Sequence, residues 1–182
     1  MLDILLSRLE TEEEKTLIEK LYHEYQAQMY NAAYAILNHP QDSEDAVQSA
    51  FEKVMEHISD YNWDLNQNTQ LLLTVITRNI ARNEIKKRNQ KLEHEIDIDD
   101  VNLDFEKILS INEEFNKITF DQIKNLINKL PTDLKNVIIM RFILDKNPKT
   151  IADFLDITDS AVYKRIAAAR KLLKDIMEGY YE

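Results

Sequence analysis

Residues 130–174 decide the fold of this chain, and they read LPTDLKNVIIMRFILDKNPKTIADFLDITDSAVYKRIAAARKLLK. Pro148 stands where its fixed φ suits the first turn of a helix and where its missing N–H is not needed. Apolar residues then follow at helical intervals, namely Ile151, Ala152 and Leu155. Residues 156–158 form a turn, after which Thr158 or Asp159 can cap a second helix. The spacing therefore predicts a helix-turn-helix.

The second helix of this pair has two unlike sides. Its apolar side carries Val162, Ile166, Ala169 and Leu173 at a 3.6-residue period. The other side is small and basic, and carries Ser160, Lys164, Ala167, Ala168 and Lys171. Small residues let a backbone approach DNA, and lysine or arginine reaches phosphates or base edges. The pattern favours DNA binding, although a solvated helix in a scaffold would show similar charges.

The composition predicts a nearly all-helical protein of one or two domains. The 182 residues include 1 Gly, 3 Pro and no Cys, with a formal net charge of −10. The absence of Cys rules out disulfides and thiolate metal sites, and it fits a reducing cytoplasm. We expect no export signal and no membrane insertion, because no basic leader and no apolar run of spanning length is present.

The charges are separated into blocks along the chain. Cations dominate between residues 76 and 91, namely Arg78, Arg82, Lys86, Lys87, Arg88 and Lys91. Carboxylates dominate residues 93–121, as is usual for solvated or disordered chain. We therefore predict an all-α chain of two small helical domains, residues 1–92 and 121–182, joined by an acidic linker over residues 93–120.

The first domain is expected to contain three main helices. Thr11 and Glu14 form a capping-box pattern at the start of the first. The second is predicted to start at Asp42, and its buried face carries Ala46, Val47, Ala50, Phe51, Val54 and Ile58. A polar loop over residues 66–70 precedes the third, whose polar stripe comprises Asn79, Arg82, Asn83 and Lys86. Amides and cations on one face can grip phosphates and read bases.

These motifs, in this order, resemble those of an extracytoplasmic-function type sigma factor, a two-domain specificity subunit of bacterial RNA polymerase. The motifs are DSEDAVQSAF, LLLTVITRN, LPxxLK and the helix-turn-helix. The resemblance covers roughly Leu17 to Lys91 and Leu130 to Lys174. It implies docking on core RNA polymerase, recognition of promoter DNA and help with strand opening. No catalytic residue, cofactor or metal is implied, and proteins of this type often bind an anti-sigma factor.

The resemblance also assigns the acidic second helix to polymerase docking. The matching residues are Asp42, Glu44, Asp45, Gln48 and Phe51. An acidic exposed face suits a basic docking surface. The alternative is that the carboxylates only stabilise a helix start, and that Phe51 belongs to the core.

The polar loop and third helix correspond to the part of the family that recognises and opens the −10 promoter element. A pocket beside the loop could hold a base swung out of the stack, lined by Asn66, Asn68 and Thr69. The strand-holding candidates are Arg78, Asn79, Arg82, Asn83 and Lys86. Tyr61 and Trp63 could stack on bases, although aromatics at a helix end are more often core. The chain departs from the family pattern at Leu72-Leu73, where an aromatic-Leu pair is usual, and at Asn83, where an acid is common.

The helix-turn-helix corresponds to the domain of the family that binds the −35 element as duplex. The reading end carries Ser160, Ala161, Tyr163, Lys164 and Arg165, and the phosphate candidates are Arg170 and Lys171. Asp156 replaces the Gly that the family commonly has in the turn, and Asp tolerates a left-handed backbone better than most residues.

Three other classes of protein compete with this interpretation. A stand-alone helix-turn-helix transcription regulator explains residues 150–174 but leaves the DSED helix without a role. A helical metalloenzyme is disfavoured, because no Glu-x-x-His spacing, Gly-rich phosphate loop or thiol occurs. A purely structural helical protein explains the apolar stripes and nothing else.

Overall fold

The structure is a computed structural model that describes residues 2–88 and 125–178. Every regular element among these residues is a helix, which confirms the all-α prediction. The chain divides into two compact units, Met1–Glu93 and His94–Glu182. The predicted acidic linker, residues 93–120, lies outside the described residues, and the exact domain boundaries stay a prediction.

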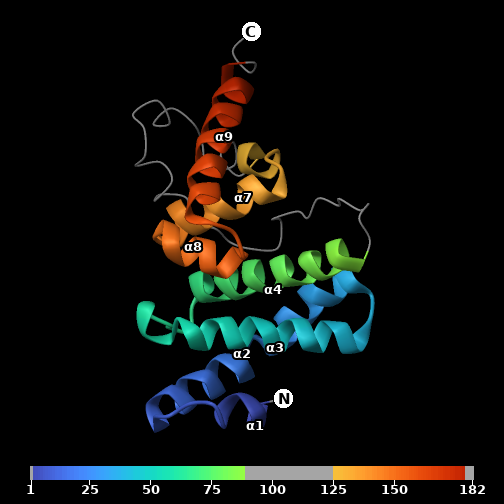
Figure 1. Cartoon of the computed structure of the whole chain (residues 1–182), viewed down its shortest axis with the longest axis vertical. Coiled ribbons are helices and arrows are strands. Elements are labelled where there is room, and N and C mark those ends of the chain that lie inside the picture. The colour runs from blue at the N-terminus through green and yellow to red at the C-terminus, as the bar shows by residue number, and fades with distance from the viewer. Residues whose placement is uncertain (1, 89–124, 179–182) are drawn as a thin grey trace. The chain divides into compact units, whose positions relative to one another are not determined.

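The N-terminal unit is a small helical bundle. Its elements are α1 (Leu2–Leu6), α2 (Glu12–Leu37), α3 (Pro40–Glu56), the 3-10 turn η1 (Ile58–Asp60) and α4 (Gln67–Arg88). Helices α2, α3 and α4 pack against one another, and α1 packs against α2 and α3. Figure 1 shows α3 and α4 running side by side. The short helix α1 was not expected from the sequence.

The predicted capping box at the start of α2 is confirmed. The Thr11 hydroxyl accepts a hydrogen bond from the Glu14 backbone N–H at 3.2 Å, and the Glu14 carboxylate accepts one from the Thr11 N–H at 3.3 Å. The helix ends at Asn38, which has a left-handed backbone (φ 48°) and donates its N–H to the Tyr34 carbonyl. Asparagine adopts this conformation more readily than most residues, so it stops the helix cleanly.

Helix α3 begins at Pro40, two residues earlier than the predicted start at Asp42. Pro40 occupies the first helical position, where a missing N–H is not needed. The cap is His39, whose Nδ1 accepts a hydrogen bond from the Asp42 N–H at 3.4 Å. The prediction placed the start too late because histidine is not one of the usual capping residues.

Helix α4 begins at Gln67, so the predicted polar loop over residues 66–70 is instead the first turn of a helix. All residues from Leu71 to Thr77 are buried, which is a longer stretch than one amphipathic face would bury. The largest fully buried side chains of the unit come from all of its longer helices, and include Ile18, Leu21, Met29, Phe51, Leu72, Leu73 and Ile76. The buried half of α4 thus fixes the position of its polar second half.

The C-terminal unit contains α7 (Thr132–Ile138), η3 (Ile139–Ile143), α8 (Pro148–Leu155) and α9 (Asp159–Glu178). Helix α9, red in Figure 1, packs against α7 and α8. The segment η3 is π-helical, with the Leu144 N–H donating to the Ile139 carbonyl five residues back at 3.0 Å. Nothing in the apolar sequence of this segment predicts that widened turn.

The predicted helix-turn-helix is confirmed in its details. Pro148 opens α8, and the Asn147 side chain caps it by accepting a hydrogen bond from the Thr150 N–H at 2.9 Å. Asp156 has a left-handed backbone (φ 54°) at the end of α8. The Ile157 N–H donates to the Ala152 carbonyl at 3.0 Å, which is the bond pattern of a Schellman motif. Asp156 therefore performs the task that glycine usually performs in such turns.

The start of α9 follows the prediction as well. The Thr158 hydroxyl accepts a hydrogen bond from the Ala161 N–H at 3.2 Å and so caps the helix. Val162, Ala169 and Leu173 are buried on the predicted apolar side, and Ile166 is half-buried. None of the helices in residues 2–88 and 125–178 is long and apolar enough to span a membrane.

Candidate functional site

The acidic residues of α3 are presented to solvent. Glu44 and Asp45 are exposed, and the Asp45 carboxylate accepts a hydrogen bond from the Gln41 amide at 3.2 Å. Gln48 is half-buried and donates a hydrogen bond to Glu52 at 3.2 Å. Phe51, in contrast, has 0% exposure and packs its ring 5.4 Å from that of Tyr22. The sequence prediction that Phe51 contacts a partner is therefore corrected: this side chain belongs to the core.

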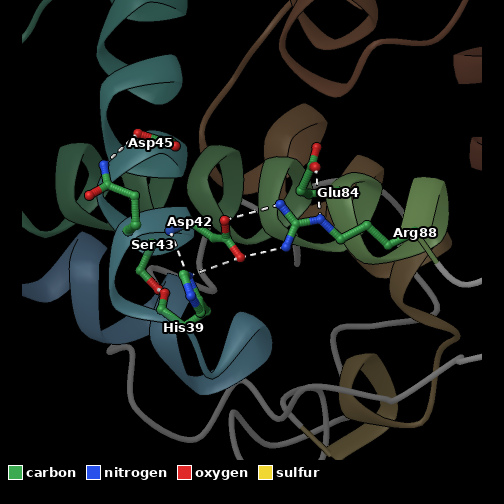
Figure 2. Close-up of polar contacts among 7 residues, drawn as sticks. His39, Asp42, Ser43, Asp45, Glu84 and Arg88 are labelled. Atoms are coloured by element: carbon green, nitrogen blue, oxygen red, sulfur yellow. Dashed lines mark hydrogen bonds and ion pairs between the residues drawn. The ribbon is translucent and has the colours of Figure 1, made fainter.

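Asp42 is the member of the acidic set that has strong partners within the chain. Arg88, the last residue of α4, donates Nη1 to Asp42 Oδ2 at 2.5 Å and Nη2 to Asp42 Oδ1 at 3.0 Å. Figure 2 shows the carboxylate lying between the guanidinium and the ring of His39, whose Nδ1 is 3.3 Å from Oδ2. Glu84 completes the group, because its Oε1 lies 3.2 Å from Arg88 Nε. Arg88 was not among the predicted site residues, since a pairing over 46 positions leaves no local pattern.

The pair changes the acidity of Asp42. The hydrogen bonds from Arg88 hold the pKa of the Asp42 carboxyl below its ordinary value, although partial burial opposes the shift, and the charges of Arg88 and His39 add to the lowering. A lowered pKa in the folded state contributes stability above the ordinary pKa, and the contribution disappears as pH falls through the lowered value. The Asp42 carboxyl is therefore ionised at neutral pH, as the ion pair with Arg88 requires.

The residues predicted to line a base pocket lie at the start of α4. The Asn66 side chain accepts a hydrogen bond from the Thr69 N–H at 3.0 Å. The Asn66 backbone carbonyl accepts one from the Tyr25 hydroxyl at 3.2 Å. Asn68 is half-buried. Thr69 has 0% exposure, so it is corrected as a candidate: its hydroxyl does not reach the surface in this structure. Asn66 remains exposed and caps the helix at the same time.

Replacing Asn66 separates these two roles. Asn66→Ala is expected to lower the free energy of unfolding by about 1 kcal/mol, because the α4 cap is lost, whereas Asn66→Asp and Asn66→Ser keep a capping oxygen. Urea unfolding followed by circular dichroism measures this effect. If Asn66 also contacts DNA, the Asp and Ser variants regain stability but not promoter opening, which permanganate footprinting detects. Full opening by both would make Asn66 a structural cap alone.

The polar stripe of α4 becomes exposed only toward the end of the helix. Asn79 is 9% exposed, while Arg78, Arg82 and Asn83 are half-buried. Lys86 is exposed, as are its neighbours Lys87 and Arg88, which together form the basic last turn. The structure thus places the readily accessible cations of α4 in that turn, and it places Asn79 against the protein.

The two aromatics before α4 form a packed corner. Trp63 is 4% exposed and donates its Nε1–H to the Ile58 carbonyl at 3.1 Å. The ring of Tyr61 meets that of Trp63 edge to face at 4.8 Å, and burial raises the pKa of the Tyr61 hydroxyl. The core alternative for Trp63 is therefore correct, and this ring has no free face for a base.

Most of the predicted reading residues of α9 are exposed to solvent. Exposed side chains come from its first half and its middle, and are Ser160, Tyr163, Lys164, Arg170 and Lys171, with Ala161 and Arg165 half-buried. Tyr163 is 59% exposed, an unusually open position for a large aromatic ring. Arg165 donates to Asp133 of α7 at 3.1 Å, and the Arg170 guanidinium lies 5.4 Å from the centre of the Phe142 ring. The contact with Asp133 orients Arg165, and the contact with Phe142 orients Arg170.

Two family models match the chain, one over each unit. Residues 21–91 match Sigma-70 region 2, and residues 120–173 match Sigma-70 region 4. Together the matches span more than half of the chain. The region 2 match contains α3 and α4 with their acidic and basic groups, and the region 4 match contains the helix-turn-helix. A stand-alone helix-turn-helix regulator would leave the region 2 match unexplained.

Comparison with solved structures finds the sigma factor RpoE from Bartonella quintana, crystallised in complex with the anti-sigma factor NepR. It is 18% identical, covers 88% of this chain and 95% of its own, and superposes with a TM-score of 0.36. Curated proteins gave no match. On the strength of both regions, found in order, the chain belongs to the sigma-70 family and is a sigma factor of the extracytoplasmic-function type, which binds core RNA polymerase and directs it to promoters.

Proposed function

We propose that three separate surfaces of this sigma factor carry its work: the exposed acids of α3 for polymerase, the polar second half of α4 for the −10 element and the first half of α9 for the −35 element. The observation that carries the proposal is the separation of exposed charge. Carboxylates face solvent on α3, whereas cations face solvent at the last turn of α4 and on α9.

The α3 surface suits a basic docking partner. Glu44 and Asp45 are exposed carboxylates on neighbouring positions, and within residues 2–88 and 125–178 neither forms an ion pair with a lysine or arginine. Complementary charge steers encounter and fixes orientation. Gln48 lies one turn further on and can add a hydrogen bond to the same partner. We therefore assign docking to Glu44, Asp45 and Gln48, with Asp42 as a fourth member whose contact with Arg88 is treated below.

The α4 surface suits a strand that is being opened. The half-buried Arg78, Arg82 and Asn83 and the exposed Lys86 form a polar track that leads away from Asn66. Cations along a groove hold the phosphates of a single strand. The same track cannot read bases through Thr69 or stack them on Trp63, since both side chains are buried. Recognition here rests on Asn66, Asn68 and the α4 track.

The α9 surface suits duplex DNA in the major groove. The small Ser160 and Ala161 let the helix approach closely, while Tyr163 and Lys164 extend from it. Arg170 and Lys171 lie two turns further on and reach phosphates rather than bases. Arg165 contacts a base edge or a phosphate, and its hydrogen bond to Asp133 holds its side chain in position.

This chain contributes binding and opening, while the polymerase supplies the phosphodiester chemistry and its metal ions. We place the protein in the cytoplasm, where the polymerase works, and an anti-sigma factor stays a prediction. The net charge of −10 opposes non-specific phosphate binding, so the free protein is expected to bind promoters weakly until polymerase covers its acidic surfaces.

Run-off transcription with purified core RNA polymerase and a promoter library tests the proposal. Initiation that depends on this chain is expected. Lys164→Ala should then reduce initiation about fivefold, as expected for the loss of roughly 1 kcal/mol from one phosphate or base contact. Lys20→Ala, an exposed lysine of α2, is the matched control and should leave initiation unchanged. An equal effect of both changes would place the −35 contact elsewhere.

A further inference from the structure

The ion pair between Asp42 and Arg88 joins the two surfaces of the N-terminal unit that have different partners. Asp42 lies in the first turn of α3, the docking helix, and Arg88 ends α4, the promoter helix. Both carboxylate oxygens of Asp42 accept from the guanidinium, at 2.5 Å and 3.0 Å. Figure 2 shows the contact bridging the two helices.

The contact engages both oxygens of Asp42 and most of the guanidinium nitrogens of Arg88. The Asp42 side chain is 15% exposed, and His39 lies beside its Oδ2 as well. The Arg88 side chain remains 52% exposed, yet Nη1, Nη2 and Nε all face the carboxylates of Asp42 and Glu84. The two-pronged geometry is the one in which arginine binds either a carboxylate or a phosphate, so the two acceptors compete for one guanidinium.

We propose that the Asp42–Arg88 pair is an electrostatic latch that withholds Arg88 from DNA in the free sigma factor and releases it when polymerase takes Asp42. This inference rests on the proposed function of α3 and α4. A basic group of the polymerase that binds Asp42 displaces the guanidinium, and Arg88 then adds its charge to that of Lys86 and Lys87 in the last turn of α4. Docking thereby strengthens the grip on promoter DNA.

The strength of the contact suits this exchange. An ion pair at the surface shifts an equilibrium by only about 1.5- to 5-fold, so a partner cation can replace Arg88 without a large penalty. The rival explanation is that the pair only fastens α3 to α4. If the pair only holds α3 against α4, its removal should weaken binding to both DNA and polymerase. If it is a latch, Asp42→Asn should strengthen binding to DNA, and Arg88→Gln should strengthen binding to polymerase.

The first test measures binding of the free, full-length protein to non-specific duplex DNA over a range of salt concentrations. Asp42→Asn is expected to bind more tightly and to steepen the slope of log K against log salt by about 0.9, the contribution of one additional phosphate contact. The double variant Asp42→Asn with Arg88→Gln should return to the wild-type slope. Arg88→Gln alone should lie close to wild type, because Asp42 holds Arg88 in most of the free molecules.

The matched control is Glu52→Gln. Glu52 lies on the same helix, and its loss removes one negative charge and frees an arginine, Arg8, which contacts it at 2.6 Å. Arg8 precedes α2, away from the basic turn of α4, so the slope should stay at the wild-type value. Equal slopes for Asp42→Asn and Glu52→Gln, or a gain that survives in the double variant, would overturn the latch.

The second test uses core RNA polymerase. Arg88→Gln should bind polymerase about two- to fivefold more tightly than wild type, because Asp42 no longer has to exchange its partner. Weaker binding of Arg88→Gln to polymerase would indicate that the pair only holds α3 against α4, and it would overturn the latch. Neither result bears on whether the chain supports promoter-dependent initiation, so failure of the latch and failure of the proposed function are separate outcomes.

Discussion

Replacing both Glu44 and Asp45 with lysine is expected to weaken binding to core RNA polymerase by at least about 100-fold. Each change puts a cation against a surface that we expect to be basic, and like charges placed together at an interface cost several kcal/mol. Both side chains are exposed on α3, and neither lies in the buried face of the helix, so the N-terminal unit should stay folded. Binding is measured by biolayer interferometry, and folding by circular dichroism.

The control keeps the same change of net charge and moves it to another helix. Glu13 and Glu24 are exposed on α2, and replacing both with lysine should leave polymerase affinity within about twofold of wild type. If the α2 variant loses binding as strongly as the α3 variant, the interaction depends on overall acidity rather than on the proposed docking surface.

Phe51→Ala is expected to lower the free energy of unfolding of the N-terminal unit by about 3–5 kcal/mol. The side chain is fully buried against Tyr22, and removal of a buried aromatic ring loses its transfer free energy and leaves a cavity. A loss of this size is a large part of the stability of a small domain. Urea unfolding followed by far-ultraviolet circular dichroism measures it.

Tyr34→Ala is the comparison, because Tyr34 is 39% exposed on α2 and its ring stacks on that of Tyr30. It should cost less than about 1 kcal/mol. The pair of variants also decides between the two interpretations of Phe51. A stable Phe51→Ala protein that fails to bind polymerase would return the ring to the docking surface, against its burial.

The sequence predicted those parts of the fold that depend on neighbours in the chain. The capping box of Thr11 and Glu14, the first-turn position of Pro148 and the left-handed Asp156 are all local, and all three are confirmed. The start of α3 was wrong because its cap is a histidine, and the loop before α4 was wrong because Asn66 caps a helix whose first turn is unusually polar.

The parts of the candidate site that could not be predicted depend on contacts between distant positions. Asp42 meets Arg88 over 46 positions, and Asp133 meets Arg165 over 32, so neither pair leaves a periodic signal. The burial of single side chains could not be predicted from the sequence either. The polar Thr69 lies in the core, although its neighbours in sequence suggested a solvated loop. Periodicity predicted the helices that carry the candidate residues, and tertiary packing decided which of those side chains are exposed.

The packed corner at Trp63 gives the molecule a built-in optical probe. The chain contains 1 Trp, and its indole is enclosed with its N–H bonded to the Ile58 carbonyl. Indole emission shifts to longer wavelength when the ring meets water, so the colour of that emission follows melting of the N-terminal unit and ignores the helix-turn-helix. Unfolding of the N-terminal unit can therefore be followed by itself without attaching a dye.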